Sequence, residues 1–87
     1  MSLPILYIKP GCPWCIDALE YFKQVDLKLE VVDVIQNPSR MSDLIECSSQ
    51  NKTPTLKNED FIVKDFDVQE FKQAMLENPT EAKKLGL

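Results

Sequence analysis

Residues 5–22 read ILYIKPGCPWCIDALEYF, and this stretch decides the fold. The apolar run at residues 5–8 predicts a strand, and apolar residues with a helical period follow from residue 13. Pro10-Gly11 separates the two patterns and is typical of a turn. Pro13 suits the first helical turn, because its missing N–H would have no intrahelical partner there. The two cysteines of the CPWC motif therefore lie where a strand ends and a helix begins.

This placement favours redox chemistry at Cys12 and Cys15. The first turn of a helix has unpaired N–H groups and the positive end of the macrodipole, which together stabilise a thiolate. Because the thiolate is the nucleophile, we expect Cys12, at the exposed mouth of the helix, to attack disulfides. Cys15 lies one turn further along and deeper, and we expect it to resolve the mixed disulfide that forms.

Other interpretations of the C-x-x-C pair are half of a zinc site and two inert core thiols. A structural zinc site needs four ligands, whereas the chain has no histidine and its third cysteine, Cys47, lies outside any ligand spacing. We therefore expect no metal. The lack of histidine also excludes a cysteine–histidine protease pair. Cys47 itself is expected to be an inert, half-buried thiol rather than a regulatory one, because nothing electropositive lies beside it in the sequence.

Length and composition predict a single domain over residues 1–87, with 44% hydrophobic and 28% charged residues. The net charge of -4 and the scattered basic residues argue against a nucleic-acid or anionic-membrane partner. No apolar run reaches the length of a membrane-spanning helix. An odd number of cysteines, a C-x-x-C motif and no secretion signal indicate a reducing compartment, so we expect a cytoplasmic monomer.

The first half of the chain predicts a strand–helix–strand unit followed by a second helix. The first helix should run from about Pro13 to Val25, and residues 28–34 alternate and then turn apolar, as a strand does. Asn37-Pro38 predicts the start of a helix that continues to about Ser48, with Asn37 as its cap. The buried face of the first helix should hold Cys15, Ala18 or Leu19, Phe22 and Val25, and Leu29 and Val31 should share one side of the second strand.

The second half predicts a β-hairpin and a last helix. Residues 55–57 and 61–63 are short strand-like runs separated by three turn residues. Asp67, with Glu70 three residues later, forms a capping box that begins the last helix. Its apolar stripe should contain Val68, Phe71, Met75 and Leu76, and Asn78-Pro79 should end it. Residues 80–87 fit either a short amphipathic turn or a frayed tail.

The element order β-α-β-α-β-β-α predicts an α/β fold. The strand–helix–strand unit implies a parallel pair, and the hairpin adds antiparallel strands. Helices on both faces of the sheet would explain why the first strand is apolar throughout.

At this point the chain resembles the glutaredoxin family of the thioredoxin superfamily. The resemblance rests on KPGCPWC at residues 9–15, on Thr53-Pro54 before the third strand and on Asp67 at the last helix, and it covers about residues 4–77. It implies a four-stranded mixed sheet flanked by helices, together with thiol–disulfide exchange. It also implies a cis peptide before Pro54, beside the cysteines; a trans proline that only starts the strand is the alternative.

The resemblance further implies glutathione as a possible electron donor. The Thr53 backbone would then pair with its cysteinyl portion, and the amides near Phe66 and Asp67 would receive its γ-glutamyl carboxylate. Lys9, with Lys52, would serve the glycyl carboxylate. Trp14 and the Thr53-Pro54 loop would form an exposed lid, although Trp14 fits a partly packed aromatic without a substrate role equally well. The implied glutathione contacts are Lys9, Trp14, Thr53, Pro54, Phe66 and Asp67.

Departures from the family pattern bear on this donor. The family usually carries a paired glycine before the last helix; we align Val63-Lys64 with it, in a hairpin one residue shorter. Lys52-Thr53-Pro54 replaces Thr-Val-Pro, and a glycine and a basic residue usual near Ser49 and Asn51 are missing. Because side chains hinder close backbone approach, we expect glutathione to reduce this protein poorly.

Three other functions remain as alternatives to a glutathione-dependent enzyme. One is a redoxin that thioredoxin reductase reduces. A second is an iron–sulfur carrier bridged by Cys12 and glutathione, although proline after the first cysteine, as at Pro13, is the pattern of the redox-active members. A redox-dead binding module is disfavoured because both cysteines are present. Protein or small-molecule disulfides are the expected substrates.

Overall fold

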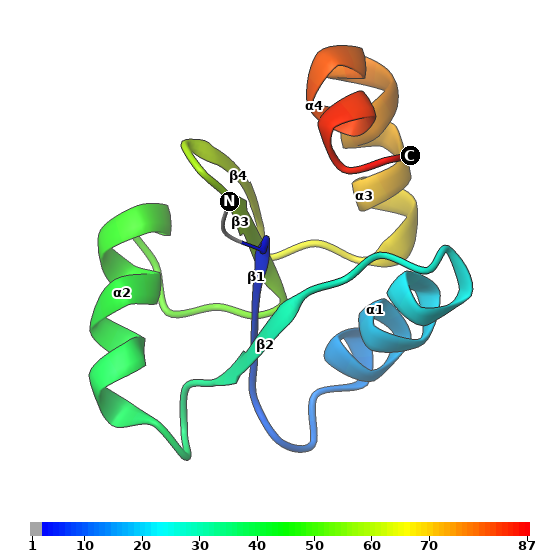
Figure 1. Cartoon of the computed structure of the whole chain (residues 1–87). Coiled ribbons are helices and arrows are strands. Elements are labelled where there is room, and N and C mark those ends of the chain that lie inside the picture. Colours follow the sequence, from blue (N-terminus) through cyan, green and yellow to red (C-terminus); the bar gives the residue numbers. More distant parts are fainter. Residues whose placement is uncertain (1–2) are drawn as a thin grey trace.

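The computed structural model describes residues 3–87, in which four strands form one mixed sheet of order β2-β1-β3-β4 (Figure 1). β1 pairs parallel with β2, whereas β3 is antiparallel to both β1 and β4. The predicted mixed sheet, its helices and their order are confirmed. The strands are β1 (Ile5–Ile8), β2 (Glu30–Asp33), β3 (Thr55–Asn58) and β4 (Phe61–Lys64), and the helices are α1 (Pro13–Gln24), α2 (Pro38–Ser48), α3 (Val68–Glu77) and α4 (Pro79–Lys84).

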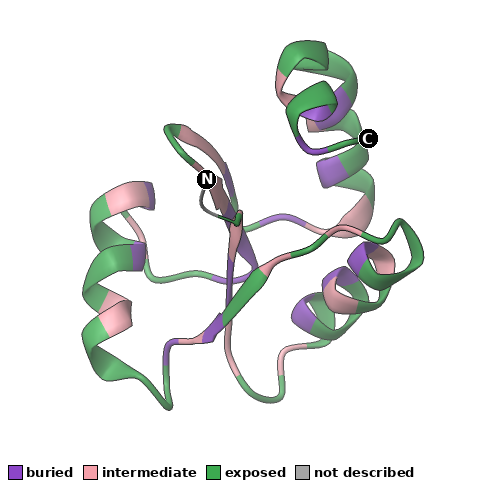
Figure 2. Cartoon of the chain, in the orientation of Figure 1, coloured by how far each residue is buried: buried purple, intermediate pink, exposed green. Residues whose placement is uncertain are grey.

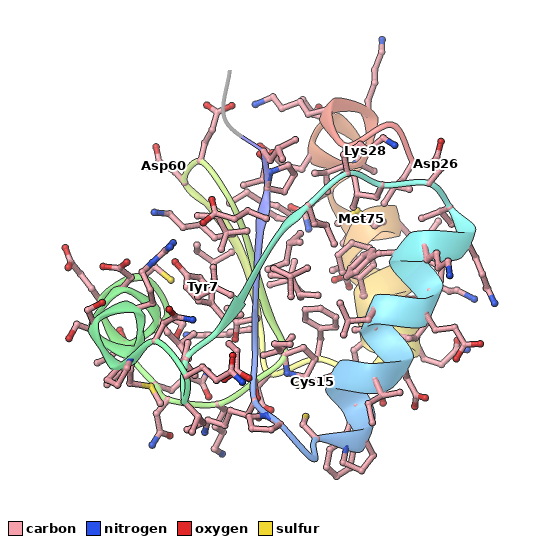
Figure 3. All side chains as sticks on the ribbon, turned by 60° about the horizontal axis from the view of Figure 1, so that its bottom comes forward. Tyr7, Cys15, Asp26, Lys28, Asp60 and Met75 are labelled. Atoms are coloured by element: carbon pink, nitrogen blue, oxygen red, sulfur yellow. The ribbon has the colours of Figure 1, made fainter. Side chains whose placement is uncertain are left out.

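The central strand β1 is buried on both faces, as its apolar sequence predicts. Leu6 packs into the larger core with α1 and α3, whereas Tyr7 belongs to a smaller core with Leu44 of α2. Figure 1 shows α1 and α3 on one side of the sheet and α2 on the other, and in Figure 3 Tyr7 points toward α2. The helices are therefore layered on both sides of the sheet.

The larger core is aromatic. The rings of Phe22 and Phe71 meet edge to face with centroids 4.9 Å apart, and Phe66 lies beside both. Each buried side chain of this size contributes about 1.5–3 kcal/mol. On α1, Ala18 rather than Leu19 is fully buried, together with Cys15 and Phe22, and Figure 2 shows these buried positions along one face of the helix. The prediction that Val25 is buried is wrong, because α1 ends before it and leaves it exposed as the C-cap.

The edge strand β2 covers residues 30–33 rather than the predicted 28–34, and its first two residues are exposed. Val32 packs with Tyr7 and Leu29 packs against the larger core, as the alternation predicts, but Val31 is 46% exposed at the edge of the sheet. Asn37 precedes α2 as expected, but its side chain does not cap the helix. Its amide donates instead to the Asp33 carbonyl at 3.0 Å, so that part of the prediction is wrong.

The C-terminal helices complete the larger core. The capping box of Asp67 and Glu70 is present, with hydrogen bonds of 2.7 and 2.9 Å. Leu76 was expected in the apolar stripe, but it is 77% exposed. The face of α3 that packs against the core carries Phe71 and Met75, and Leu76 lies outside that face. Residues 79–84 form the short helix α4 rather than a frayed tail, since Ala82 and Leu85 are buried in the core. None of the helices within residues 3–87 combines the length and apolar character needed to cross a membrane.

Candidate active site

Cys12 is the N-cap of α1. Its backbone is extended (φ -94°, ψ 109°), and its Sγ accepts a hydrogen bond from the Cys15 N–H at 3.2 Å. Gly11 before it has φ +72°, a left-handed conformation that brings β1 round into the helix and that glycine adopts without strain. Negative charge on the Cys12 sulfur would therefore meet an N–H donor and the positive end of α1.

Cys15 is buried behind Cys12 with only 2% of its surface exposed, and Figure 3 shows it at the start of α1 beside the end of β1. Burial, followed by the hydrogen bond with Cys12, raises the pKa of the Cys15 thiol. The Thr53 side chain and the Lys9 backbone act in the opposite direction and lower this pKa. All three cysteines are free thiols, and Cys12 is the more exposed of the motif pair. A disulfide substrate would therefore reach Cys12 first.

Thr53-Pro54 closes the site from the other side. The peptide between them is cis, which confirms the prediction made from the resemblance. The Thr53 carbonyl and hydroxyl oxygens each lie 3.9 Å from Cys12 Sγ; the thiol donates to the carbonyl, and the hydroxyl donates to the sulfur. The prediction that this loop forms an exposed lid is wrong, because both residues are buried. The Pro54 carbonyl accepts the Phe66 N–H at 3.2 Å, so the loop is bonded to the segment that precedes α3.

Trp14 lies at the surface next to the cysteines, with 58% of its surface exposed. Lys9 is half-buried directly after β1, and its backbone lowers the pKa of the Cys15 thiol. Lys52 is exposed, and its ammonium lies 3.9 Å from the Asp65 carboxylate. The structure therefore brings Cys12, Cys15 and Thr53-Pro54 together, with Trp14 at the rim.

The two amides expected to receive a carboxylate are already bonded within the protein. The Phe66 N–H donates to the Pro54 carbonyl, and the Asp67 N–H donates to Glu70 Oε1 at 2.9 Å. In the structure, neither of these two amides is free for a ligand. Within residues 3–87, the N–H groups that start α3 without a hydrogen-bond partner are those of Val68 and Gln69.

Val63 and Lys64, which the sequence aligns with the family's glycine pair, lie before the turn that leads into α3. Both are strand residues of β4; Val63 pairs with Leu56 and packs in the larger core. Lys64 extends its ammonium to the Ser48 carbonyl at 3.3 Å, at the end of α2. The residue with left-handed backbone before α3 is Asp65, with φ +52°. The position that glycine would suit is therefore Asp65.

Cys47 lies on the opposite face of the sheet, half-buried, and its thiol donates to the Leu44 carbonyl at 3.5 Å. Burial raises the pKa of this thiol, which is consistent with the inert interpretation. Among residues 3–87, no group of three or more histidine, cysteine or acidic side chains is arranged to hold a metal ion.

Comparison with known proteins identifies the family. The model of the family described as glutaredoxin matches residues 5–62, a span that contains both cysteines of the motif. The chain belongs to the glutaredoxin family. Membership assigns it thiol–disulfide oxidoreductase chemistry in general, and it confirms the resemblance noted in the sequence.

Solved structures share the thioredoxin-like fold. A glutaredoxin from Archaeoglobus fulgidus is 19% identical with a TM-score of 0.73, covering 84% of this chain and 85% of that one. A thioredoxin-like protein is 24% identical with a TM-score of 0.72, covering 80% and 96%. A buckwheat glutaredoxin solved as a glutathione complex is 12% identical with a TM-score of 0.71, covering 95% and 76%. At these identities the likeness supports the fold alone. A comparison with curated proteins found no match.

Sequence reasoning missed two residues near the site, Thr55 and Asp65. Thr55 is buried at the start of β3, where its β-branched side chain looked like an ordinary strand residue. The sequence could have predicted a turn at Asp65, because aspartate tolerates the left-handed region and is common in turns. Both lie in the segments that join the Thr53-Pro54 loop to α3.

Proposed function

We propose that this glutaredoxin-family chain is a dithiol oxidoreductase in which Cys12 attacks and Cys15 resolves. The observation that carries the proposal is the arrangement of the two sulfurs. Cys12 is half-buried at the N-cap of α1, and Cys15 lies one turn behind it with 2% exposure. Protein or small-molecule disulfides are the proposed substrates, and Trp14 at the rim is the proposed contact for them.

In the first step, the Cys12 thiolate attacks one sulfur of the substrate disulfide. A bond forms between Cys12 and that sulfur, and the other substrate sulfur leaves as a thiolate. In the second step, Cys15 loses its proton and attacks Cys12 Sγ, which releases the remaining substrate thiol and leaves a Cys12–Cys15 disulfide. Because burial raises the pKa of Cys15, this step needs a proton acceptor, and the departing substrate thiolate can take that role.

Serine substitutions test the two roles. Cys12→Ser should abolish all exchange, because the attacking sulfur is gone. Cys15→Ser should instead accumulate a mixed disulfide on Cys12, detectable by mass spectrometry of the intact protein, and should keep any reaction that needs one thiol. Identical behaviour of the two variants would contradict the assignment.

The internal disulfide must be reduced by a donor, and glutathione is the first candidate. The family membership and the buckwheat complex with glutathione support it. In this chain the cysteinyl portion would pair with the Thr53 backbone, and the γ-glutamyl carboxylate would meet the free amides of Val68 and Gln69. The nearby Asp67 carboxylate would then face the ligand's ammonium.

Thioredoxin reductase is the second candidate donor, and a specific observation favours it. The Phe66 and Asp67 amides are occupied, and Asp65 carries a side chain where glycine would let a tripeptide approach the backbone. A coupled assay distinguishes the donors: oxidised protein is offered glutathione with its reductase, or thioredoxin reductase, and oxidation of the nicotinamide cofactor is followed. Faster turnover with thioredoxin reductase would support the second donor.

A further inference from the structure

The loop between α2 and β3 carries Thr53 to within 3.9 Å of Cys12 Sγ. It is held there by Thr55, the first residue of β3, which is fully buried. The Thr55 hydroxyl donates to the Lys52 carbonyl at 2.9 Å and accepts the Asp65 N–H at 3.3 Å. One side chain thus ties the loop to the segment that enters α3.

The position of this bridge makes it specific to the site. The hydrogen bond from Thr55 to Lys52 encloses Thr53, which contacts Cys12, and the following Pro54. The Asp65 N–H donates to the same hydroxyl, so Thr55 is also bonded to the segment between β4 and α3. In that segment, the next residue, Phe66, makes the backbone hydrogen bond to Pro54. If the hydroxyl is removed, the Lys52 carbonyl and the Asp65 N–H both lose their hydrogen bond to the buried Thr55 side chain, and the link between the two segments is lost.

We propose that Thr55 is a positioning residue for Cys12, acting through Thr53. The inference rests on the proposed role of Cys12 as the attacking thiol. At 3.9 Å the Thr53 hydroxyl makes a long contact with sulfur, so a small outward movement of the loop breaks it. A hydroxyl that donates to sulfur favours the thiolate, because hydrogen bonds to the charged form stabilise it. Thr55 therefore supports Cys12 reactivity without touching it.

Thr55→Val tests this role, because valine keeps the shape and burial of threonine but lacks the hydroxyl. Two measurements are made on the reduced protein at a temperature where every variant is folded: disulfide exchange, and the pH profile of iodoacetamide alkylation at Cys12. We expect Thr55→Val to slow exchange about fivefold, equivalent to about 1 kcal/mol, and to move the alkylation profile to higher pH. Thr55→Ser, which keeps the hydroxyl, should stay within about twofold of the original protein.

Val34→Ala is the matched control for stability, since Val34 is buried in the smaller core away from the bridge. It should lower the free energy of unfolding without moving the alkylation profile. The Thr55→Val effect should also disappear in a Thr53→Val background, because the hydroxyl through which it acts is absent. Should Thr55→Val fail to fold, the pair Thr55→Ser and Thr55→Ala, which differ only in the hydroxyl, makes the same comparison.

The outcomes separate the two proposals. Slow or unselective alkylation of Cys12 in the original protein would overturn the attacking role of Cys12 and, with it, the positioning role. Rapid alkylation at Cys12 that Thr55→Val leaves unchanged would overturn the positioning role alone. If Thr55→Ser or Val34→Ala moved the alkylation profile as far as Thr55→Val does, the positioning role would also be overturned, and Thr55 would be only a structural residue.

Discussion

At the scale of single residues, the chain makes its tight turns with few glycines. Only two glycines are present, and within residues 3–87 four other residues adopt positive φ. Each lies at or next to the end of an element: Asp26 after α1, Ser49 after α2, Glu59 in the hairpin and Asp65 before α3. A left-handed backbone costs a residue with a Cβ about 1–2 kcal/mol relative to the right-handed form. Asp65 is the one beside the active site, so its conformation bears on function.

We expect glycine at position 65 to be more stable than alanine by about 1 kcal/mol, because only glycine adopts φ +52° without strain. The comparison is Asp65→Gly against Asp65→Ala, measured as the free energy of unfolding by urea. Lys72, exposed within α3, is the control position. There Lys72→Ala should be the more stable by about 1 kcal/mol, since glycine disfavours a helix interior. The same order at both positions would contradict the left-handed assignment of Asp65.

At the scale of elements, two helices with similar sequence signals begin in different ways. Both α2 and α3 follow a residue type that caps helices, Asn37 and Asp67. Asp67 accepts the Glu70 N–H and completes a capping box, whereas the Asn37 amide turns back to the Asp33 carbonyl. The Asp33 carboxylate in turn accepts the N–H groups of Ile35 and Gln36, which fixes the turn before α2. The sequence signal therefore marks both helix starts but not the contact that the side chain makes.

Asp67→Ala should lower the free energy of unfolding by about 1 kcal/mol, the usual cost of losing an N-cap. Asn37→Ala is the matched control and should cost less, because the Asn37 side chain makes no cap hydrogen bond to α2. Chemical denaturation of the two variants and the original protein measures the difference. Equal losses would contradict the expectation, because the hydrogen bond from Asn37 to the Asp33 carbonyl would then stabilise the protein as much as the Asp67 cap does.

The elements were predictable because their signals are local. The strand at residues 5–8, the capping box at Asp67 and the hairpin are written in periodicity and turn residues within a few positions. The site was predictable only in part. Cys12 and Cys15 follow from one motif, and the capping box implies that the Asp67 N–H is bonded to Glu70, but the bond from the Phe66 N–H to Pro54 depends on a partner distant in sequence. The packing of Val63 in the larger core is also a tertiary feature, since it depends on pairing with Leu56 of β3.

At the scale of the whole molecule, the sheet separates two regions that both bury weak acids. Cys15 lies under the active site, and Tyr7 and Cys47 lie between the sheet and α2. Burial is the largest cause that raises the pKa of each of these groups above its ordinary value of 9.0 for a thiol or 10.0 for tyrosine. In the folded protein all three hold their protons more tightly than in the unfolded chain. Stability is therefore linked to alkaline pH on both faces of the sheet.

The linkage predicts that the free energy of unfolding falls as pH rises above about 9, because the unfolded chain then releases these protons first. The stabilising contribution is complete below the unfolded pKa values and is lost as pH passes through the raised folded values. Each group can add at most about 1.4 kcal/mol per pH unit to the slope. Tyr7→Phe and Cys47→Ala remove one buried acid each from the same small core, so each should flatten the decline. Urea unfolding at a series of pH values from 7 to about 11 measures how steeply the free energy of unfolding falls. This pH range spans the ordinary pKa values of the three groups. A decline as steep in both variants as in the original protein would mean that neither group is linked to folding, and that the alkaline loss arises elsewhere.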